Sequence, residues 1–194
     1  MRTFETELTL RHINPFKLNG YDIHAAVEKA VFEDTEAPTQ YVFSSLLDAD
    51  ARQVKVLVRT SHRTQYPGER ESIHEFKNGD YVKFAVRFVP LKNVKDATGK
   101  TRQRFIRDSI DRELKFHGYA ERAGLDVLSV EEVEITSTNF AKGKRPPFGI
   151  TDVTLIVEAH ITDKREFELA YASGLGKKVT FGYGYIHLLE HANV

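Results

Sequence analysis

A tyrosine and a histidine three residues apart, Tyr21 and His24, are the side chains of this sequence best suited to proton transfer. Residues three apart share one face of a helix, so the phenol and the imidazole can converge on one small group. An imidazole exchanges a proton near neutral pH, and a phenol is better as a donor. Taken alone, such a pair is more often structural than catalytic, and both interpretations stay open.

A glycine-rich run near the end of the sequence is a second candidate site. It has neither the spacing of a dinucleotide fingerprint nor that of a Walker loop. Glycines let a backbone approach a ligand closely, and adjacent lysines add positive charge, which together predict a cradle for a phosphodiester. Glycines that serve a tight turn and a bulge are the alternative of equal weight. The run contains Gly174, Gly176, Lys177, Lys178, Gly182 and Gly184.

Positive charge gathers in two further tracts, although 28 Lys and Arg residues balance 28 Asp and Glu residues overall. A neutral protein with segregated basic tracts can present a phosphate-binding surface. Solvated loops without a ligand are the alternative for either tract. The first tract holds Lys100, Arg102, Arg104 and Arg107, and the second holds Lys142, Lys144 and Arg145.

No metal site or cofactor is expected. The sequence has no cysteine, which excludes thiolate zinc sites, iron–sulfur ligation, cysteine nucleophiles and disulfides. The run His187-Leu-Leu-Glu190-His191 matches the H-x-x-E-H pattern of one metallopeptidase class. That pattern requires a helix to bring both imidazoles together, whereas here it continues a strand-like stretch, so we interpret the match as accidental.

The cellular compartment expected from composition is the cytoplasm. Absence of cysteine fits a reducing environment. No apolar run approaches the ~18 to 20 residues of a membrane helix, and the N-terminal residues alternate charge too early for a signal peptide. We therefore expect neither a membrane span nor secretion.

Apolar periodicity predicts an α+β protein. In the first half, alternation predicts strands at residues 3–11, 40–47, 53–61 and 81–89. Between the first two of these we expect a helix that is capped by Asn19 and runs to residue 32, and there is room for a second helix at 70–76. In the second half we expect a helix at 105–124, whose apolar positions include Ile110 and Leu114, strands at 125–136 and 149–161, a helix from Asp163 to Gly174 and a strand at 181–189. This order suggests two tandem ferredoxin-like (RNA-recognition-like) modules with antiparallel sheets. Residues 1–93 would carry the Tyr/His pair, and residues 94–194 the basic and glycine-rich loops.

Three segments resemble one known family. They are NGYDIHAAVEKAV, VKFAVRFVPLK followed by DATGK, and the terminal G-x-G-x-x-x-x-x-G-x-G. They resemble the CRISPR repeat-processing endoribonuclease of the type I-E Cascade complex, in the RAMP superfamily, over almost the whole chain. The resemblance implies tandem ferredoxin-like modules, metal-free cleavage of the repeat hairpin of precursor CRISPR RNA, retention of the product, and assembly with other subunits of a Cascade-type surveillance complex.

By this resemblance, Tyr21 and His24 fall on the family's Tyr-x-x-His catalytic pair, and residues 174–184 on its glycine-rich loop. The family commonly places a loop lysine where this chain has Val179, so either Lys177 or Lys178 inherits the phosphate contact. His24 is the expected general base and Tyr21 its orienting or acidic partner. A non-cleaving RNA-binding subunit of the same complex is the alternative function, and a protein-interaction domain a more distant one.

Overall fold

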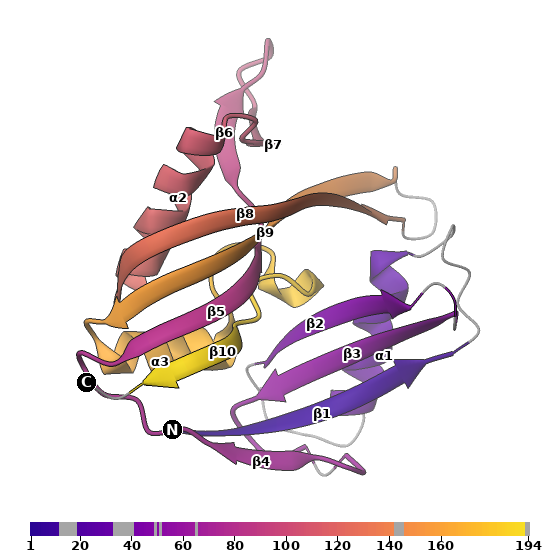
Figure 1. Ribbon diagram of the computed structural model, residues 1–194. Coiled ribbons are helices and arrows are strands. Elements are labelled where there is room, and N and C mark those ends of the chain that lie inside the picture. The colour runs from indigo at the N-terminus through magenta and orange to yellow at the C-terminus, as the bar shows by residue number, and fades with distance from the viewer. Residues whose placement is uncertain are drawn as a thin grey trace.

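The computed structural model describes residues 1–11, 19–32, 41–48, 50, 52–64, 66–141 and 146–192. Within these ranges it consists of antiparallel sheets and helices, which confirms the predicted α+β class (Figure 1). No helix in these ranges is long and apolar enough to cross a membrane. The elements are β1 (Arg2–Leu10), α1 (Gly20–Phe32), β2 (Tyr41–Asp48), β3 (Gln53–Thr60), β4 (Arg70–Ile73), β5 (Tyr81–Phe88), β6 (Leu91–Lys95), β7 (Thr101–Phe105), α2 (Ser109–Arg122), β8 (Leu125–Phe140), β9 (Phe148–Ile161), α3 (Lys164–Ser173), the 3-10 helix η2 (Val179–Phe181) and β10 (His187–Ala192).

The first sheet has the order β2-β3-β1-β4 and packs against α1. The apolar residues of α1 recur at three and four positions, so they form one stripe along the helix. Ile23, Val27 and Val31 of this stripe are buried against Phe43 and Val56 of the sheet. Because this stripe packs against the sheet, it determines how α1 is oriented and therefore where Tyr21 and His24 lie.

The second sheet has the order β10-β5-β9-β8, and α2 and α3 cover one of its faces (Figure 1). Apart from the inserted β6–β7 hairpin and η2, its chain order, β5-α2-β8-β9-α3-β10, is that of a ferredoxin-like β-α-β-β-α-β unit. Alternate residues of β5 are buried, and Phe84 and Val86 pack in one core with Phe116 of α2 and Phe167 of α3. The strand predicted at 81–89 is therefore confirmed, with its apolar face toward the helices.

The first module contains a strand where the sequence left room for a second helix. Residues 70–73 form β4, which pairs antiparallel with β1 from Arg2↔Ile73 to Glu5↔Arg70. The backbone groups of residues 70–73 thus form hydrogen bonds with the open edge of β1, whereas in a helix they would have bonded to one another. This first sheet keeps the strand order of a ferredoxin-like unit, and the described residues between β3 and β4 form no second helix.

The sheets divide the chain between β4 and β5. β5 pairs with β9 and β10 of the second sheet, whereas the sequence-based division at residue 93 assigned it to the first module. Local periodicity identifies a strand but carries no information about which distant strand accepts its hydrogen bonds. The division between the two sheets lies at residues 74–80, and the expected boundary at residue 93 differs from it.

Two details of the second module also differ from the prediction. Helix α2 begins at Ser109 and buries Arg112, Phe116 and Ala120, while Ile110 and Leu114, expected to face the core, are 67% and 65% exposed. Asp108 caps the helix by accepting a hydrogen bond from the backbone N–H of Asp111, which sets this later start. The last strand begins only at His187, because residues 179–181 form η2 and residues 183–186 are irregular.

Candidate active site

The first turn of α1 is fastened to the end of β8 by Asn19. Its side-chain carbonyl accepts hydrogen bonds from the backbone N–H groups of Tyr21 (3.2 Å) and Ala141 (3.0 Å), and its amide donates to the Ala141 carbonyl (2.7 Å). Position 20 is glycine because a Cβ there would collide with the ring of Phe140. The predicted cap at Asn19 is confirmed, and it also sets the position of Tyr21 relative to the second module.

Tyr21 lies in an aromatic cluster that joins three distant parts of the chain. Its ring meets those of Phe140, Phe148 and Phe181 edge-on, at centroid distances of 5.8, 6.1 and 5.7 Å. Phe140 and Phe148 come from the facing ends of β8 and β9, and Phe181 from the glycine-rich loop. These edge-to-face contacts hold the half-buried phenol at the junction between the two modules.

His24 is held by groups on three sides. Its side chain is 17% exposed, and its Nε2 lies 3.3 Å from Oε1 of Glu28. Its Nδ1 lies 3.5 Å from the hydroxyl of Tyr41, and its ring centroid is 5.6 Å from that of Phe181. The side chains of Tyr21 and His24 therefore both lie against the ring of Phe181.

Tyr41 also lies at the site, although it is not among the residues predicted from the sequence. Burial and the negative charge of Glu28 raise the pKa of Tyr41 to about 12, so its hydroxyl keeps its proton at neutral pH. It lies 17 positions from His24 in sequence, and only the pairing of β2 with β3 brings it there, so no local pattern could have revealed it. Glu28 could have been found, because residues four apart are helix neighbours.

The four glycines of the glycine-rich loop all have positive φ, from 79° to 99°. A side chain at Gly182 would press on the ring of Phe43, and one at Gly184 would collide with the backbone of Leu175. A hydrogen bond from the Leu175 N–H to the Gly184 carbonyl (2.8 Å) closes the loop, and one from the Gly184 N–H to the Arg87 carbonyl (2.8 Å) joins it to β5. Backbone conformation and packing thus account for these glycines, which favours the turn interpretation of the glycines themselves.

The two loop lysines differ in their surroundings. Both are partly exposed, and Lys178 adopts a left-handed conformation with a φ of 65°. Its ammonium lies 6.0 Å from the centroid of the Phe181 ring, which in turn contacts Tyr21 and His24. Of the two lysines, Lys178 therefore has the clearer connection to the Tyr/His pair.

The basic tract at residues 100–107 lies apart from this site. Lys100 precedes β7, which carries Arg102 and Arg104 and forms a hairpin with β6 that projects beyond α2, away from α1 (Figure 1). The side chains of Lys100, Arg102 and Arg104 are exposed. Arg102 forms an ion pair with Asp96 (2.7 Å). Arg107 follows the hairpin and is also exposed. Lys142, Lys144 and Arg145 lie outside the described residues.

The two histidines of the H-x-x-E-H run have separate partners. His187 Nε2 lies 2.9 Å from the Ser44 hydroxyl, and His191 Nε2 lies 2.8 Å from Oδ2 of Asp80. Both lie on β10, which confirms that this run is a strand rather than a metalloprotease helix. In the part of the chain that the structure describes, no three His, Asp or Glu side chains gather as a metal site would require.

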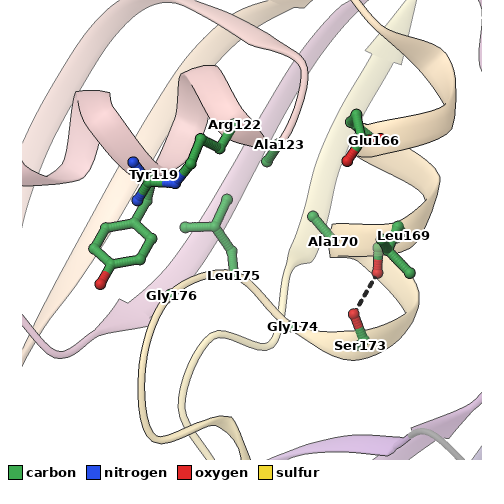
Figure 2. A pocket seen from close by; sticks show the side chains of 10 residues that line it. All are labelled: Tyr119, Arg122, Ala123, Glu166, Leu169, Ala170, Ser173, Gly174, Leu175 and Gly176. Carbon is green, nitrogen blue, oxygen red and sulfur yellow. Dashed lines mark hydrogen bonds between the residues drawn. The ribbon is translucent and has the colours of Figure 1, made fainter.

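Two cavities formed by the described residues lie outside the Tyr/His pair, and the smaller one borders the glycine-rich loop. The smaller, of about 170 Å³, lies between α2, α3 and the start of the loop, as Figure 2 shows, and is lined by residues such as Tyr119, Glu166 and Gly176. The larger, of about 760 Å³, lies between β2 and the open face of the second sheet and includes Arg87. The guanidinium of Arg87 is already paired with the buried carboxylate of Asp152 (2.8 Å).

Comparison with known proteins places the chain among CRISPR proteins. A family model described as CRISPR associated protein matches residues 6–189. Thermus thermophilus Cse3 bound to an RNA representing a pre-cleavage complex is similar in structure, with a TM-score of 0.77, 18% identity, and coverage of 98% of this chain and 100% of that chain. The CRISPR-associated protein Cas6e from Escherichia coli K-12 gives a TM-score of 0.74 at 14% identity, with 97% and 98% coverage.

A chain of a CRISPR RNA-guided surveillance complex gives a TM-score of 0.70 at 16% identity and covers 95% of this chain and 98% of that chain. At such low identity these matches show that the fold is shared. A search of curated protein sequences finds no match.

Proposed function

Since this chain belongs to the CRISPR associated protein family, we propose that it is a metal-independent endoribonuclease that cleaves the repeat hairpin of precursor CRISPR RNA and keeps hold of the product. The observation that carries the proposal is the meeting of Tyr21, His24 and the lysine-bearing loop at one phenylalanine, Phe181. Two solved structures that share the fold support it, because they are of the CRISPR endoribonuclease Cse3 bound to a 19-nucleotide RNA and of Cse3 bound to an RNA representing a pre-cleavage complex.

The proposed reaction uses the 2′-hydroxyl of the RNA as nucleophile. His24 accepts the proton of that hydroxyl while a bond forms between the 2′-oxygen and phosphorus. The bond from phosphorus to the 5′-oxygen breaks, and the leaving oxygen takes a proton from the acid, for which Tyr21 is the candidate. Lys178 stabilises the charge of the phosphorane. The products are a 2′,3′-cyclic phosphate and a 5′-hydroxyl.

The remaining basic residues bind the RNA in this proposal. Duplex RNA is recognised mainly through its shape and its phosphates, which suits exposed arginines on a projecting hairpin. Lys100, Arg102, Arg104 and Arg107 would follow the stem, and Lys142, Lys144 and Arg145 would contact its base. The other proposed partners are subunits of a Cascade-type complex, since one similar chain belongs to a CRISPR RNA-guided surveillance complex. Because its proposed substrate is a cellular RNA, the protein would act in the cytoplasm.

The decisive experiment is cleavage of hairpin repeat RNA in EDTA, followed by analysis of the product ends. We expect cutting to persist and to leave a 2′,3′-cyclic phosphate, because the proposed nucleophile, base and acid are all supplied without a metal. A 2′-deoxy substitution at the cut site should block cleavage and preserve binding, since it removes the nucleophile and leaves nearly all of the binding surface of the RNA unchanged.

Two outcomes contradict the proposal. Activity that disappears in EDTA and returns with Mg²⁺ or Zn²⁺ would show a different mechanism, as would cutting of the 2′-deoxy substrate. Binding of the hairpin without any cleavage would identify the chain as the alternative, a non-cleaving RNA-binding subunit.

The loop lysines provide a second prediction. Replacing Lys177 and Lys178 together with alanine should weaken hairpin binding and flatten the slope of log K against log salt by about 0.7 to 0.9 for each phosphate that is no longer neutralised. Binding measured across a salt series tests this. The control is the pair Lys55 and Lys164, exposed lysines of β3 and α3, whose replacement by alanine should leave the slope near its original value. If the slope of log K against log salt is unchanged in the loop variant, these lysines are solvated side chains that do not bind RNA.

A further inference from the structure

We propose that Glu28 and Tyr41 are positioning residues that hold His24 in a single tautomer, with its proton on Nε2, so that Nδ1 is the nitrogen that accepts the proton of the RNA hydroxyl. This inference rests on the proposed function, because it gives His24 the role of base. Beyond the proposed function, it gives roles to Glu28 and Tyr41 and states which ring nitrogen of His24 carries the proton and which acts as the base.

The first support is the contact with Glu28. Its Oε1 lies 3.3 Å from Nε2 of His24, one helical turn away on α1. An ionised carboxylate has no proton to donate, so this close contact favours a proton on the nitrogen that faces it, Nε2. In a neutral imidazole the other nitrogen then carries the free lone pair. Glu28 therefore favours Nδ1 as the basic nitrogen.

The second support is independent and comes from a different element. The Tyr41 hydroxyl, at the start of β2, lies 3.5 Å from Nδ1. Because the pKa of Tyr41 is raised to about 12, this phenol stays protonated at neutral pH and has a proton to donate to Nδ1 when the ring proton is on Nε2. A donor beside Nδ1 favours a lone pair on that nitrogen. Contacts on opposite sides of the ring thus select the same tautomer.

The arrangement has the order of a carboxylate–imidazole–hydroxyl relay. In such relays the carboxylate orients the ring and stabilises the imidazolium that forms when the hydroxyl proton is taken up. Here Glu28 fills the carboxylate position, and the hydroxyl of Tyr41 marks the place beside Nδ1 where a hydroxyl group can be accepted. At 3.5 Å the Tyr41 contact is long for an O–H donor, so a 2′-hydroxyl can replace it at low cost.

Nuclear magnetic resonance of the RNA-free protein tests the tautomer directly. The ¹⁵N chemical shifts of the neutral His24 ring distinguish a protonated nitrogen from one with a lone pair. We expect the wild type to be almost wholly the Nε2–H form. Glu28→Ala and Tyr41→Phe should each move the ring toward the mixture of a free histidine. Glu28→Gln keeps an acceptor oxygen and should restore the single form.

Single-turnover cleavage gives the second readout. Glu28→Ala should lower the rate constant about tenfold, a fraction of the full effect of general base catalysis, while hairpin affinity stays within a few-fold. Asp22→Asn is the matched control, because it removes the same charge from α1 at an exposed carboxylate that contacts Asn19 instead of His24. It should change neither the tautomer nor the rate.

The inference is overturned if the wild-type ring is a mixture or carries its proton on Nδ1, or if Glu28→Ala alters neither ¹⁵N shifts nor rate. These results are distinguishable from failure of the proposed function. The tautomer is read without RNA, whereas the function fails only if the wild type does not cut the hairpin.

Discussion

Replacement of His24 with alanine is expected to lower the cleavage rate by ~10² to 10⁴-fold, the usual contribution of general acid–base catalysis. The imidazole in the proposed reaction moves a proton and makes no phosphate contact. Hairpin affinity should therefore remain within a few-fold of the wild-type value. Single-turnover kinetics at saturating protein, combined with an equilibrium binding measurement, separate these two effects.

His117→Ala is the matched control for this variant. His117 also lies four residues from a glutamate on a helix, with Nε2 3.7 Å from Oε1 of Glu113, but it belongs to α2 and is outside the site. Its replacement should leave cleavage unchanged. If His24→Ala cuts at the wild-type rate, His24 is not the base, and a structural role for the Tyr/His pair is the remaining interpretation.

Tyr21→Phe tests the division of labour between the two residues. The ring contacts with Phe140, Phe148 and Phe181 survive this change, so only the hydroxyl is removed. A rate loss comparable to that of His24→Ala would identify Tyr21 as the acid. A smaller loss would identify it as an orienting group, and full activity would remove it from the mechanism.

Local sequence was sufficient to predict the helix that carries the candidate site. The apolar spacing of Ile23, Val27 and Val31, together with the cap at Asn19, determines where α1 begins and which face it buries. Tyr21 and His24 then lie at the edge of that face as a direct consequence of helix geometry. The terminal glycines were equally visible, although their positive φ and close packing explain them better than a ligand does.

Features that depend on pairing between distant segments could not be predicted. Tyr41 reaches His24 because β2 pairs with β3, and β4 exists because β1 offers an open edge. On α2 the prediction followed Ile110 and Leu114, yet the buried face includes the polar Arg112. Arg112 is accommodated because it donates to Glu132 of β8 (2.8 Å) and to the Ile106 carbonyl (3.3 Å), partners that no local pattern reveals.

One such long-range contact, made by Arg59 of β3, joins the two modules. Its side chain is 3% exposed, and its guanidinium forms an ion pair with Glu5 of β1 (2.8 Å). It also donates to the backbone carbonyls of Tyr171 (2.9 Å) and Ile186 (3.2 Å) and to the Tyr185 hydroxyl (3.0 Å), all in the second module. The rings of Tyr171 and Tyr185 have their centroids 3.7 and 4.2 Å from the guanidinium carbon, which adds cation–π attraction.

Replacing Arg59 with methionine is expected to lower the free energy of unfolding by about 3 to 5 kcal/mol, the usual cost of removing one partner from a buried ion pair. Methionine fills much of the same space but leaves two carbonyls without donors and the Glu5 carboxylate without its cation. A urea titration measures the loss. Arg63→Met, which removes an exposed arginine paired with Glu71 (3.2 Å), is the control and should cost less than about 1 kcal/mol.

The double variant Arg59→Met with Glu5→Gln identifies the origin of that loss. If the unpaired carboxylate of Glu5 causes most of the loss, Glu5→Gln recovers part of the free energy of unfolding. An uncharged amide costs less free energy than an unpaired charge at this partly buried position. A loss below about 1 kcal/mol in Arg59→Met alone would contradict the assignment of Arg59 as the buried link between modules.

Because His24 belongs to the first module and Phe181 to the second, a weakened link should also slow cleavage under conditions where the variant remains folded. Cleavage that stays at the wild-type rate in the folded variant would show that the aromatic contacts around Phe181 keep the two modules in their relative positions without Arg59.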